Sequence, residues 1–337
     1  MQDFIRRTLT ATVAIAALAG LGAAAQAETK EVRFGRQLGV GYLQLYVMEE
    51  LKLVEKHARA AGLGEVKASY KPVGAPAVLN DLLLGGNVDL IAAGTPPFIV
   101  LWDKTVGNIA VKGVSALNSQ PAFLNTNRPN VRSLKDFTDK DKIALPSVRV
   151  SFQAITLQMA AEKEFGVGQH TRLDHLTVSL AHPEGVAALL SGASEITGHF
   201  TSPPFQYQEL EDPKISRVIS SYDYTGKASF SALSATTKFV QDNPKTYAAL
   251  LAALKEATDV IAKQPDEAVR IFIKIDNSKL PADFLKKMIT DKDFSYSLAP
   301  ENLLKFTDFM QRTGTIRNKP ASWKDLFHPG IHDQAGS

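Results

Sequence analysis

The stretch GGNVDLIAAGTPP, residues 85–97, joins a glycine turn, an acidic residue, an apolar run, and a threonine followed by two prolines. A second stretch, SGASEITGHFTSPP at residues 191–204, has the same features in the same order, with one additional residue before its prolines. Leu-Leu precedes both stretches. Agreement in order, spacing and residue type predicts an internal repeat. The chain is therefore expected to contain two similar lobes.

Strand and helix patterns alternate around the first copy. Apolar or alternating runs at 32–36, 66–71 and 109–116 predict strands, as does the apolar part of 85–97. Helical spacing of apolar residues follows at 43–57 and again after Pro76. This alternation predicts an α/β lobe with a mainly parallel sheet.

The stretch KIALPSVRVSFQAITLQMAAE, residues 142–162, begins the second lobe and predicts strand, tight loop and helix. Ser151 is placed to cap the helix, whose first N–H groups would then point beyond the end of the strand. Helix starts attract anions, and Arg149 lies in the same loop. An anion-binding loop is therefore predicted here, although many such turns bind nothing.

The rest of the second lobe repeats the pattern, with strands at 175–179 and 215–221 and a helix at 183–191. After residue 221 only helices are predicted, and this tail is expected to pack back on the first lobe. The chain would then cross between lobes near 118–127 and 221–230, which makes a hinge. The predicted division is 28–120 and 225–337 for lobe 1 and 121–224 for lobe 2.

Residues 1–27 have the pattern of a secretory signal peptide. Arg6 and Arg7 form a basic start, residues 10–25 are apolar, and Ala25-Gln26-Ala27 is a cleavage site. Removing Asp3, Arg6 and Arg7 lowers the formal charge from +3 to +2, too little to indicate nucleic acid as a partner. The chain has no cysteine, which excludes disulfides and thiol catalysis. A periplasmic protein is predicted, with either the general or the twin-arginine export route open.

Sequence motifs for common catalytic and metal sites are absent. We find no G-x-S-x-G, phosphate loop, H-E-x-x-H or EF-hand loop, so no cofactor is predicted. His170, His175, His182 and His199 fall in the second lobe, but their spacing fits no compact metal site. His199, at a strand end, is either structural or a ligand donor. Tyr42, beside Gly39 and Gly41, favours a cleft position, and Thr95 is typical of a helix cap.

Several motifs together resemble those of substrate-binding proteins of ABC importers for nitrate, sulfonates, taurine and bicarbonate, a family related to binders of thiamine-pyrimidine precursors. The resemblance covers the mature chain. The motifs are GYL (41–43), LLGGNVD (83–89), GTPP (94–97), IALPS (143–147), DNP (242–244) and SWKDLF (322–327). The resemblance implies a two-lobed periplasmic binding protein (type II) fold, each lobe a mainly parallel sheet flanked by helices, with two hinge crossings.

The resemblance also implies where the ligand lies, namely between the lobes. It implicates the loops after the first strands and after their counterparts in the second lobe. The predicted ligand-binding residues are Gln37, Gly39, Tyr42, Gly94, Thr95, Pro96, Ser147, Arg149, Ser151, His199, Phe200 and Thr201. Sulfonate binders commonly have a Trp-Asp-Pro turn where this chain has HFTSPP (199–204).

The function predicted is that of a monomeric, non-enzymatic solute-binding protein. It would bind a small organic anion, such as a sulfonate or a taurine-like molecule, and deliver it to a membrane permease. Three alternatives stay open: a binder of a neutral or aromatic heterocycle, a secreted hydrolase that uses Ser147 or Ser151 with His199, and a metal binder. The related pyrimidine synthases use a cysteine-rich motif that this chain lacks.

Overall fold

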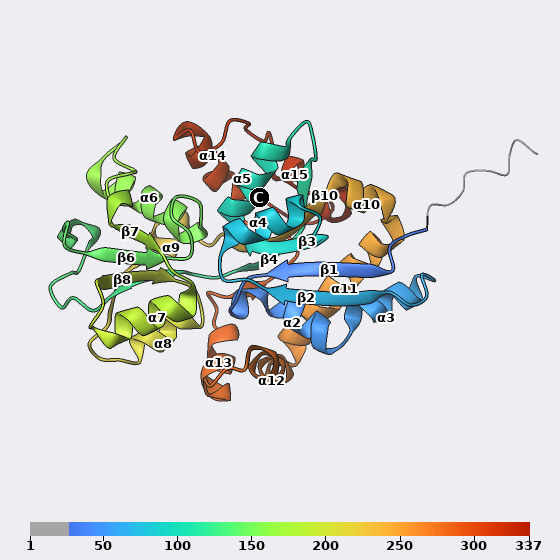
Figure 1. The fold of residues 1–337 in the computed structure, drawn as a ribbon, viewed down its shortest axis with the longest axis horizontal. Helices are drawn as coiled ribbons and strands as arrows, with labels where there is room; N and C mark the ends of the chain where they lie inside the picture. Colours follow the sequence, from blue (N-terminus) through green and yellow to red (C-terminus); the bar gives the residue numbers. More distant parts are fainter. Residues whose placement is uncertain (1–26) are drawn as a thin grey trace, which may run out of the picture.

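The computed structural model describes residues 27–337, so the predicted signal peptide, apart from Ala27, lies outside the described residues. Within residues 27–337, no helix is long and apolar enough to cross a membrane. The chain forms two lobes side by side, each built on one sheet (Figure 1).

The first lobe contains a six-stranded sheet in the order β11-β4-β10-β3-β1-β2. Its strands are β1 (Glu31–Arg36), β2 (Lys67–Pro72), β3 (Leu90–Gly94), β4 (Val111–Ser119), β10 (Ser229–Thr236) and β11 (Ser295–Tyr296). Strand β1 is parallel to β2 and β3, whereas β10 is antiparallel to both β3 and β4.

The second lobe contains a five-stranded sheet in the order β7-β6-β8-β5-β9. Its strands are β5 (Phe123–Thr126), β6 (Lys142–Leu145), β7 (Thr177–Ser179), β8 (Ile196–Thr201) and β9 (Ser216–Ser220). Strand β6 is parallel to β7 and β8, and β5 is antiparallel to β8 and β9.

The two sheets share one plan. The order β2-β1-β3-β10-β4 in the first corresponds to β7-β6-β8-β5-β9 in the second. In each of these five-strand orders one strand is antiparallel to its neighbours, and it enters directly from the other lobe, β5 after β4 and β10 after β9. The predicted α/β fold is confirmed, with two mixed sheets in place of mainly parallel ones, and so are strands in both copies of the repeat.

Strands β5 and β10, each of which enters its sheet from the other lobe, were not predicted from the sequence. The expectation that only helices follow residue 221 is wrong, because β10 lies inside the first sheet. Its sequence, SFSALSAT, is rich in serine and alanine and contains no valine or isoleucine. The polar segment before residue 127 likewise contains β5, whose four residues are buried. Small and polar residues form these strands because neighbouring strands bond both of their edges.

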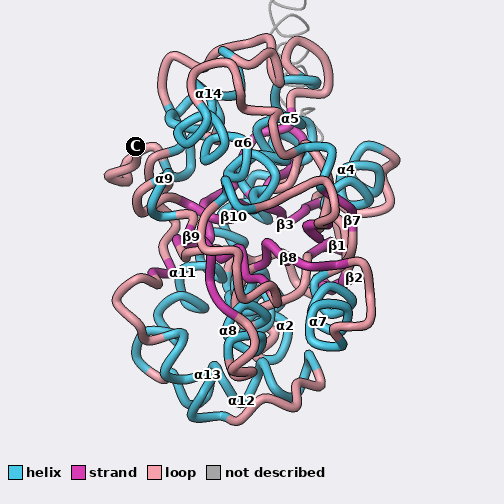
Figure 2. Tube along the Cα trace, turned by 90° about the vertical axis from the view of Figure 1, so that its left-hand side faces the viewer, coloured by secondary structure: helices cyan, strands magenta, loops and turns pink. Residues whose placement is uncertain are grey.

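Helices cover both faces of the sheets (Figure 2). In the first lobe and the tail they are α2 (Leu43–Glu50), α3 (Leu53–Ala60), α4 (Pro76–Leu84), α5 (Thr95–Thr105), α10 (Thr237–Asp242), α11 (Pro244–Lys263), α12 (Pro265–Asp276), α13 (Ala282–Ile289), α14 (Leu303–Arg312) and α15 (Trp323–Leu326). In the second lobe they are α6 (Phe152–Phe165), α7 (His182–Ser191), α8 (Phe205–Leu210) and α9 (Tyr222–Thr225). Short 3₁₀ turns are η1 (Val40–Tyr42), η2 (Leu134–Asp136), η3 (Asp174–Leu176) and η4 (Pro329–Ile331).

Local signals account for the helix ends. Ser151 Oγ accepts a hydrogen bond from Ala154 N at 3.1 Å, as predicted for a cap of α6. The single helix predicted over 43–57 is instead divided into α2 and α3, because Lys52 adopts a left-handed conformation with φ 49°.

The tail packs on the first lobe and reaches the second. Helix α11 lies against α2 and α3, and α14 contacts both α5 and α6. Arg312 of α14 forms a two-pronged ion pair with Glu162 of α6, with N–O distances of 3.0 and 2.5 Å. This pair lowers the pKa of Glu162 to about 2. The tail thereby adds a contact between the two lobes.

The motif at 322–327 fixes the end of the chain to the sheet. Ser322 and Asp325 form a capping box around α15, and Phe327 is fully buried. A bridge pairs Phe327 with Gly113 of β4, and His328 N donates to Gly113 O at 2.8 Å. A β-carbon at Gly113 would lie 2.3 Å from the Phe327 ring, so only glycine leaves room for it.

Gly113→Ala should therefore lower the free energy of unfolding by ~1–3 kcal/mol through overpacking. Urea unfolding of Gly113→Ala, Phe327→Leu and the double variant forms a double-mutant cycle. The smaller leucine should relieve the overlap, so the double variant should be more stable than the sum of the two single changes predicts. Strictly additive effects would show that this contact does not limit the residue at 113.

Candidate functional site

The carboxyl edges of the two sheets face each other, and three loops of the first lobe meet three segments of the second. The loop after β1 meets the loop after β8, and the loop after β2 meets the loop before α7. The loop after β3 meets the start of α6. Ligands of open α/β sheets bind beyond the carboxyl ends of parallel strands. The contact between the lobes is therefore the candidate site.

Glycine makes each of these approaches possible. A β-carbon on the first-lobe glycine would lie close to the second lobe in every case: 2.8 Å from Pro203 O at Gly39, 3.1 Å from Ala181 Cβ at Gly74, and 3.4 Å from Phe152 Cβ at Gly94. Gly39 also has φ 104°, which side chains rarely adopt. The lobes are thus closed on each other in this structure.

Gln37 joins two of the first-lobe loops. Its side-chain Oε1 accepts hydrogen bonds from the Tyr42 hydroxyl at 3.0 Å and from Gly94 N at 3.4 Å. Both side chains are buried, with 4% of Gln37 and 3% of Tyr42 exposed. Burial raises the pKa of Tyr42, so its hydroxyl stays protonated and acts as a donor.

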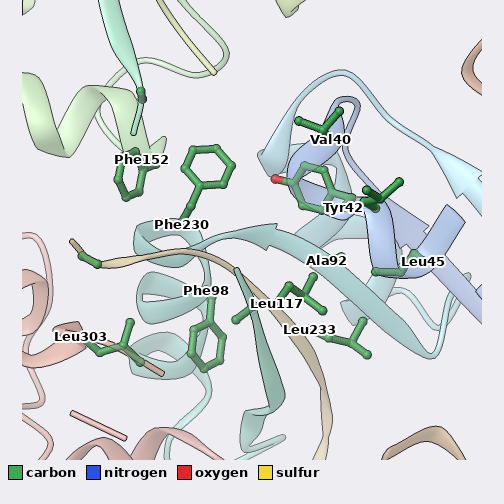
Figure 3. Packing of buried hydrophobic residues seen from close by; sticks show 14 of the residues in the cluster. Val40, Tyr42, Leu45, Ala92, Phe98, Leu117, Phe152, Phe230, Leu233 and Leu303 are labelled. Atoms are coloured by element: carbon green, nitrogen blue, oxygen red, sulfur yellow. The ribbon is translucent and has the colours of Figure 1, made fainter. Parts of the chain in front are cut away.

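An aromatic pair closes the same region from both lobes. Phe152 begins α6 in the second lobe, Phe230 lies on β10, and their ring centroids are 4.8 Å apart. Figure 3 shows Phe230 between Phe152 and Tyr42, whose hydroxyl points toward that side. The Phe230 ring also lies against Gly41. The wall of the site is therefore partly apolar.

The crossing from β4 to β5 adds polar groups that were not among the predicted site residues. Gln120 is fully buried, and neither its amide nitrogen nor its oxygen has a hydrogen-bond partner among the described residues. Its nitrogen would lie 2.9 Å from a β-carbon at Gly41. Neighbouring Asn118 is satisfied, because it donates to Gly41 O and accepts from Ser231 Oγ. The predicted crossing at 118–127 was the signal that could have identified Gln120, since a hinge borders the cleft.

Thr95 and Pro96 lie at this site, with a different role for Thr95 than the one predicted. Gly94, rather than Thr95, is the N-cap of α5. The Thr95 hydroxyl donates to Ser229 O at 2.5 Å and so connects α5 to β10. Pro96 is buried in the first turn of α5.

The three predicted residues in the loop between β6 and α6 lie in different surroundings. Ser147 and Ser151 are buried, and Ser151 Oγ is engaged as the helix cap. Arg149 is exposed, with φ 68°, and lines a cavity of about 590 Å³ with residues including His170 and Thr313. Arg149 is therefore not brought together with Tyr42 and Thr95.

The three predicted residues of β8 divide between the two faces of its sheet. Phe200 belongs to the apolar core on one face. On the other face, His199 Nδ1 bonds Glu209 of α8, and the Thr201 hydroxyl bonds His182 Nδ1 at 2.7 Å. All three β8 side chains are fully buried.

The histidines support the loop that meets Gly39. His182 Nε2 lies 3.3 Å from Ser202 Oγ, and its ring stacks on Phe205 with centroids 5.3 Å apart. Glu209 also accepts from Asn125 Nδ2 at 2.8 Å. This buried polar network therefore holds residues 201–205 in place. Glu209 escaped sequence reasoning because a polar residue on a short helix carries no distinguishing pattern.

The arrangement bears on two of the alternative functions. His199 bonds Glu209, and Ser151 Oγ is engaged with Ala154 N, so neither serine–histidine pair predicted for a hydrolase is seen. No group of three or more His, Cys, Asp or Glu among residues 27–337 is placed to hold a metal ion.

Comparisons with known proteins begin with sequence families. Residues 25–275 match the model of the NMT1-like family. A search of curated protein sequences finds no significant match.

Solved structures share the fold at low identity. The alkanesulfonate-binding protein SsuA from Xanthomonas axonopodis pv. citri, bound to MOPS, superimposes with a TM-score of 0.68 at 14% identity, covering 86% of this chain and 95% of that one. The periplasmic nitrate-binding protein NrtA from Synechocystis PCC 6803 gives 0.69 at 17% identity, covering 89% and 84%. The Candida albicans CA3427 gene product, described as having the generic periplasmic binding protein fold, gives 0.67 at 14% identity, covering 88% and 96%.

His182 should make the folded protein sensitive to acid. Burial lowers its pKa to about 3 from an ordinary value of 6.5. Between these pH values the unfolded chain binds a proton that the folded chain does not, so stability should fall as the pH drops below 6.5. The slope from one such group reaches ~1.4 kcal/mol per pH unit.

Urea unfolding of wild type and His182→Gln at neutral and mildly acidic pH measures this contribution. The variant should lose less stability on acidification than the wild type does. His175→Gln, which changes an exposed histidine, is the control and should follow the wild type. An equal pH dependence for wild type and His182→Gln would contradict the prediction.

Proposed function

We propose, from the premise that this chain belongs to the NMT1-like family, that it is an extracytoplasmic solute-binding protein of an ABC importer. It would enclose a small solute between its lobes without altering it and present the closed complex to a membrane permease. The predicted signal peptide supports a periplasmic location, and a monomer would suffice for this task.

The observation that carries the proposal is the meeting of three loop pairs around buried polar groups. Gly39, Gly74 and Gly94 bring the first lobe into contact with the second. Gln37 and Gln120 are buried at this contact. Buried polar groups are normally hydrogen-bonded, so unpartnered ones between two lobes are expected to bond a solute.

The energy required is modest. A micromolar complex corresponds to ~−8 kcal/mol. Several hydrogen bonds of ~1 kcal/mol each, together with burial of apolar surface against the Phe152 and Phe230 rings, can supply it. No covalent step is needed.

The finer prediction is that the solute is an organic anion. Such an anion can be bound by a cation or by the N–H groups at a helix start. Arg149, the cation proposed from the sequence, lies on a separate cavity. Helix α6 starts at the site and carries N–H groups that can face a ligand. The solved relatives named above are 14–17% identical and share the fold, so the ligand has to be argued from the site itself.

Closure can be tested by a wedge at Gly74, which has space for no large side chain when the lobes meet. Gly74→Trp should hold the lobes apart and prevent ligand-dependent closure. Because the chain has no cysteine, spin labels can be placed at Val106→Cys and Val167→Cys, which are 46% and 89% exposed in the native chain. Double electron–electron resonance then measures the distance between the two spin labels, and thus between the lobes.

The readouts are this distance and the melting temperature, with a probe panel of nitrate, methanesulfonate, taurine, urea, 2-pyrrolidone and uracil. A ligand at a hundred times its Kd adds ~2.7 kcal/mol of stability. Wild type and the exposed control Val78→Trp should respond to at least one probe, and Gly74→Trp should not. A response of Gly74→Trp equal to the wild type, or no response of the wild type to any probe, would refute the proposal.

A further inference from the structure

We infer that the solute is uncharged and offers carbonyl-type acceptors, as an amide, a urea or a lactam does, to three buried glutamines. These are Gln37 of the first lobe, Gln120 of the crossing and Gln153 of the second lobe. The inference rests on the proposed function and specifies its ligand.

Gln37 presents a free donor. Its oxygen is occupied by Tyr42 and by Gly94 N, which fixes the amide orientation. No hydrogen bond engages its amide nitrogen among residues 27–337, although the side chain is only 4% exposed. Two N–H groups are therefore left for a ligand acceptor.

Gln120 presents both ends of its amide. Its side chain is fully buried, and both polar atoms lack partners among the described residues. Leaving such a group unpaired costs ~1–3 kcal/mol. Its amide nitrogen lies beside Gly41, one residue before the Tyr42 whose hydroxyl bonds Gln37.

Gln153 provides the third amide, from the opposite lobe. It follows Phe152 in the first turn of α6, and Phe152 is the residue that meets Gly94. The Gln153 side chain is 2% exposed, and its amide nitrogen has no partner among the described residues. Amide donors of the first lobe, the crossing and the second lobe thus lie on segments that border the contact between the lobes.

The cation that precedes Gln37 already has a counter-charge. Arg36 ends β1, and its guanidinium lies 3.7 Å over the Tyr46 ring and 3.6 Å from Glu49, both on α2, while its Nε and Nη1 have no hydrogen-bond partner among the described residues. Arg149 is exposed on a different cavity. An ion enclosed without a counter-charge loses its hydration at a cost of several kcal/mol. The amides instead match a neutral acceptor.

The helix starts at the lobe contact are also weak anion sites. Proline occupies the first turn of α4, α5 and α7, at Pro76, Pro96, Pro97 and Pro183, and proline has no N–H to donate. In α7, the Glu184 carboxylate accepts from Ala181 N and places a negative charge at the helix start. Among the helices that begin at the described lobe contact, α6 and α2 start without proline or an acidic residue in the first turn.

Isothermal titration calorimetry separates the ligand classes. The neutral probes are urea, 2-pyrrolidone and uracil, and the anionic probes are nitrate and methanesulfonate, each tested at low and high NaCl. We expect binding of at least one neutral probe with an affinity that salt leaves unchanged, since screening acts on charges. Binding of anions alone, weakened by salt, would overturn this inference while leaving the proposed function intact. Binding by neither class would overturn both.

Glutamine variants tie the binding to the three amides. Gln120→Leu should weaken the neutral probe by about tenfold or more, and Gln120→Glu should weaken it further by replacing N–H donors with a carboxylate. Gln153→Leu should likewise weaken binding of the neutral probe. Gln311→Leu, on the exposed surface of α14, is the matched control and should bind as the wild type does. Melting temperatures establish that each variant is folded. Unchanged affinity in folded Gln120→Leu and Gln153→Leu would refute the role of the amides.

Discussion

The structure depends on close backbone contact between the carboxyl edges of its two sheets. At Gly39, Gly74 and Gly94 the first lobe approaches the second so closely that a β-carbon would touch it. Because Gly39 and Gly74 follow β1 and β2 and Gly94 ends β3, the contact forms at the edge where parallel α/β sheets bind ligands. Shape alone therefore brings the two halves of the site together, and the side chains between them determine what they enclose.

Those side chains fall into two groups with different physical roles. One group bonds within the protein: Thr95 bonds β10, Ser151 caps its own helix, and His199 bonds Glu209 through Nδ1 beneath the loop that meets Gly39. The other group, Gln120 and Gln153, is buried with amide nitrogens that lack protein partners in the described chain. Buried polar atoms are rarely left unpaired. The division separates residues that build the site from residues available to a solute.

Much of the fold was predictable from local patterns. The strand, cap and helix of 142–165 appeared as expected, because Ser151, an uninterrupted apolar stripe and a terminal glycine act within a few residues. The segments that contain the first-lobe residues from Gln37 to Pro96 lie together as expected, since loops after parallel strands meet at one edge, and their binding role stays a prediction. Strands β5 and β10 escaped prediction because their small and polar residues become buried only between strands from distant parts of the chain.

The sequence by itself determined the repeated α/β plan, the places where the chain crosses between lobes, and the loops that meet. These follow from spacing, glycine and proline, which act locally. Only the tertiary structure decided which polar groups remain free. Arg149 and His199 were predicted as ligand-binding residues, yet one faces solvent and the other bonds Glu209. Gln120 became a candidate because folding removed it from water without giving it a partner, and that property depends on neighbours far away in the sequence.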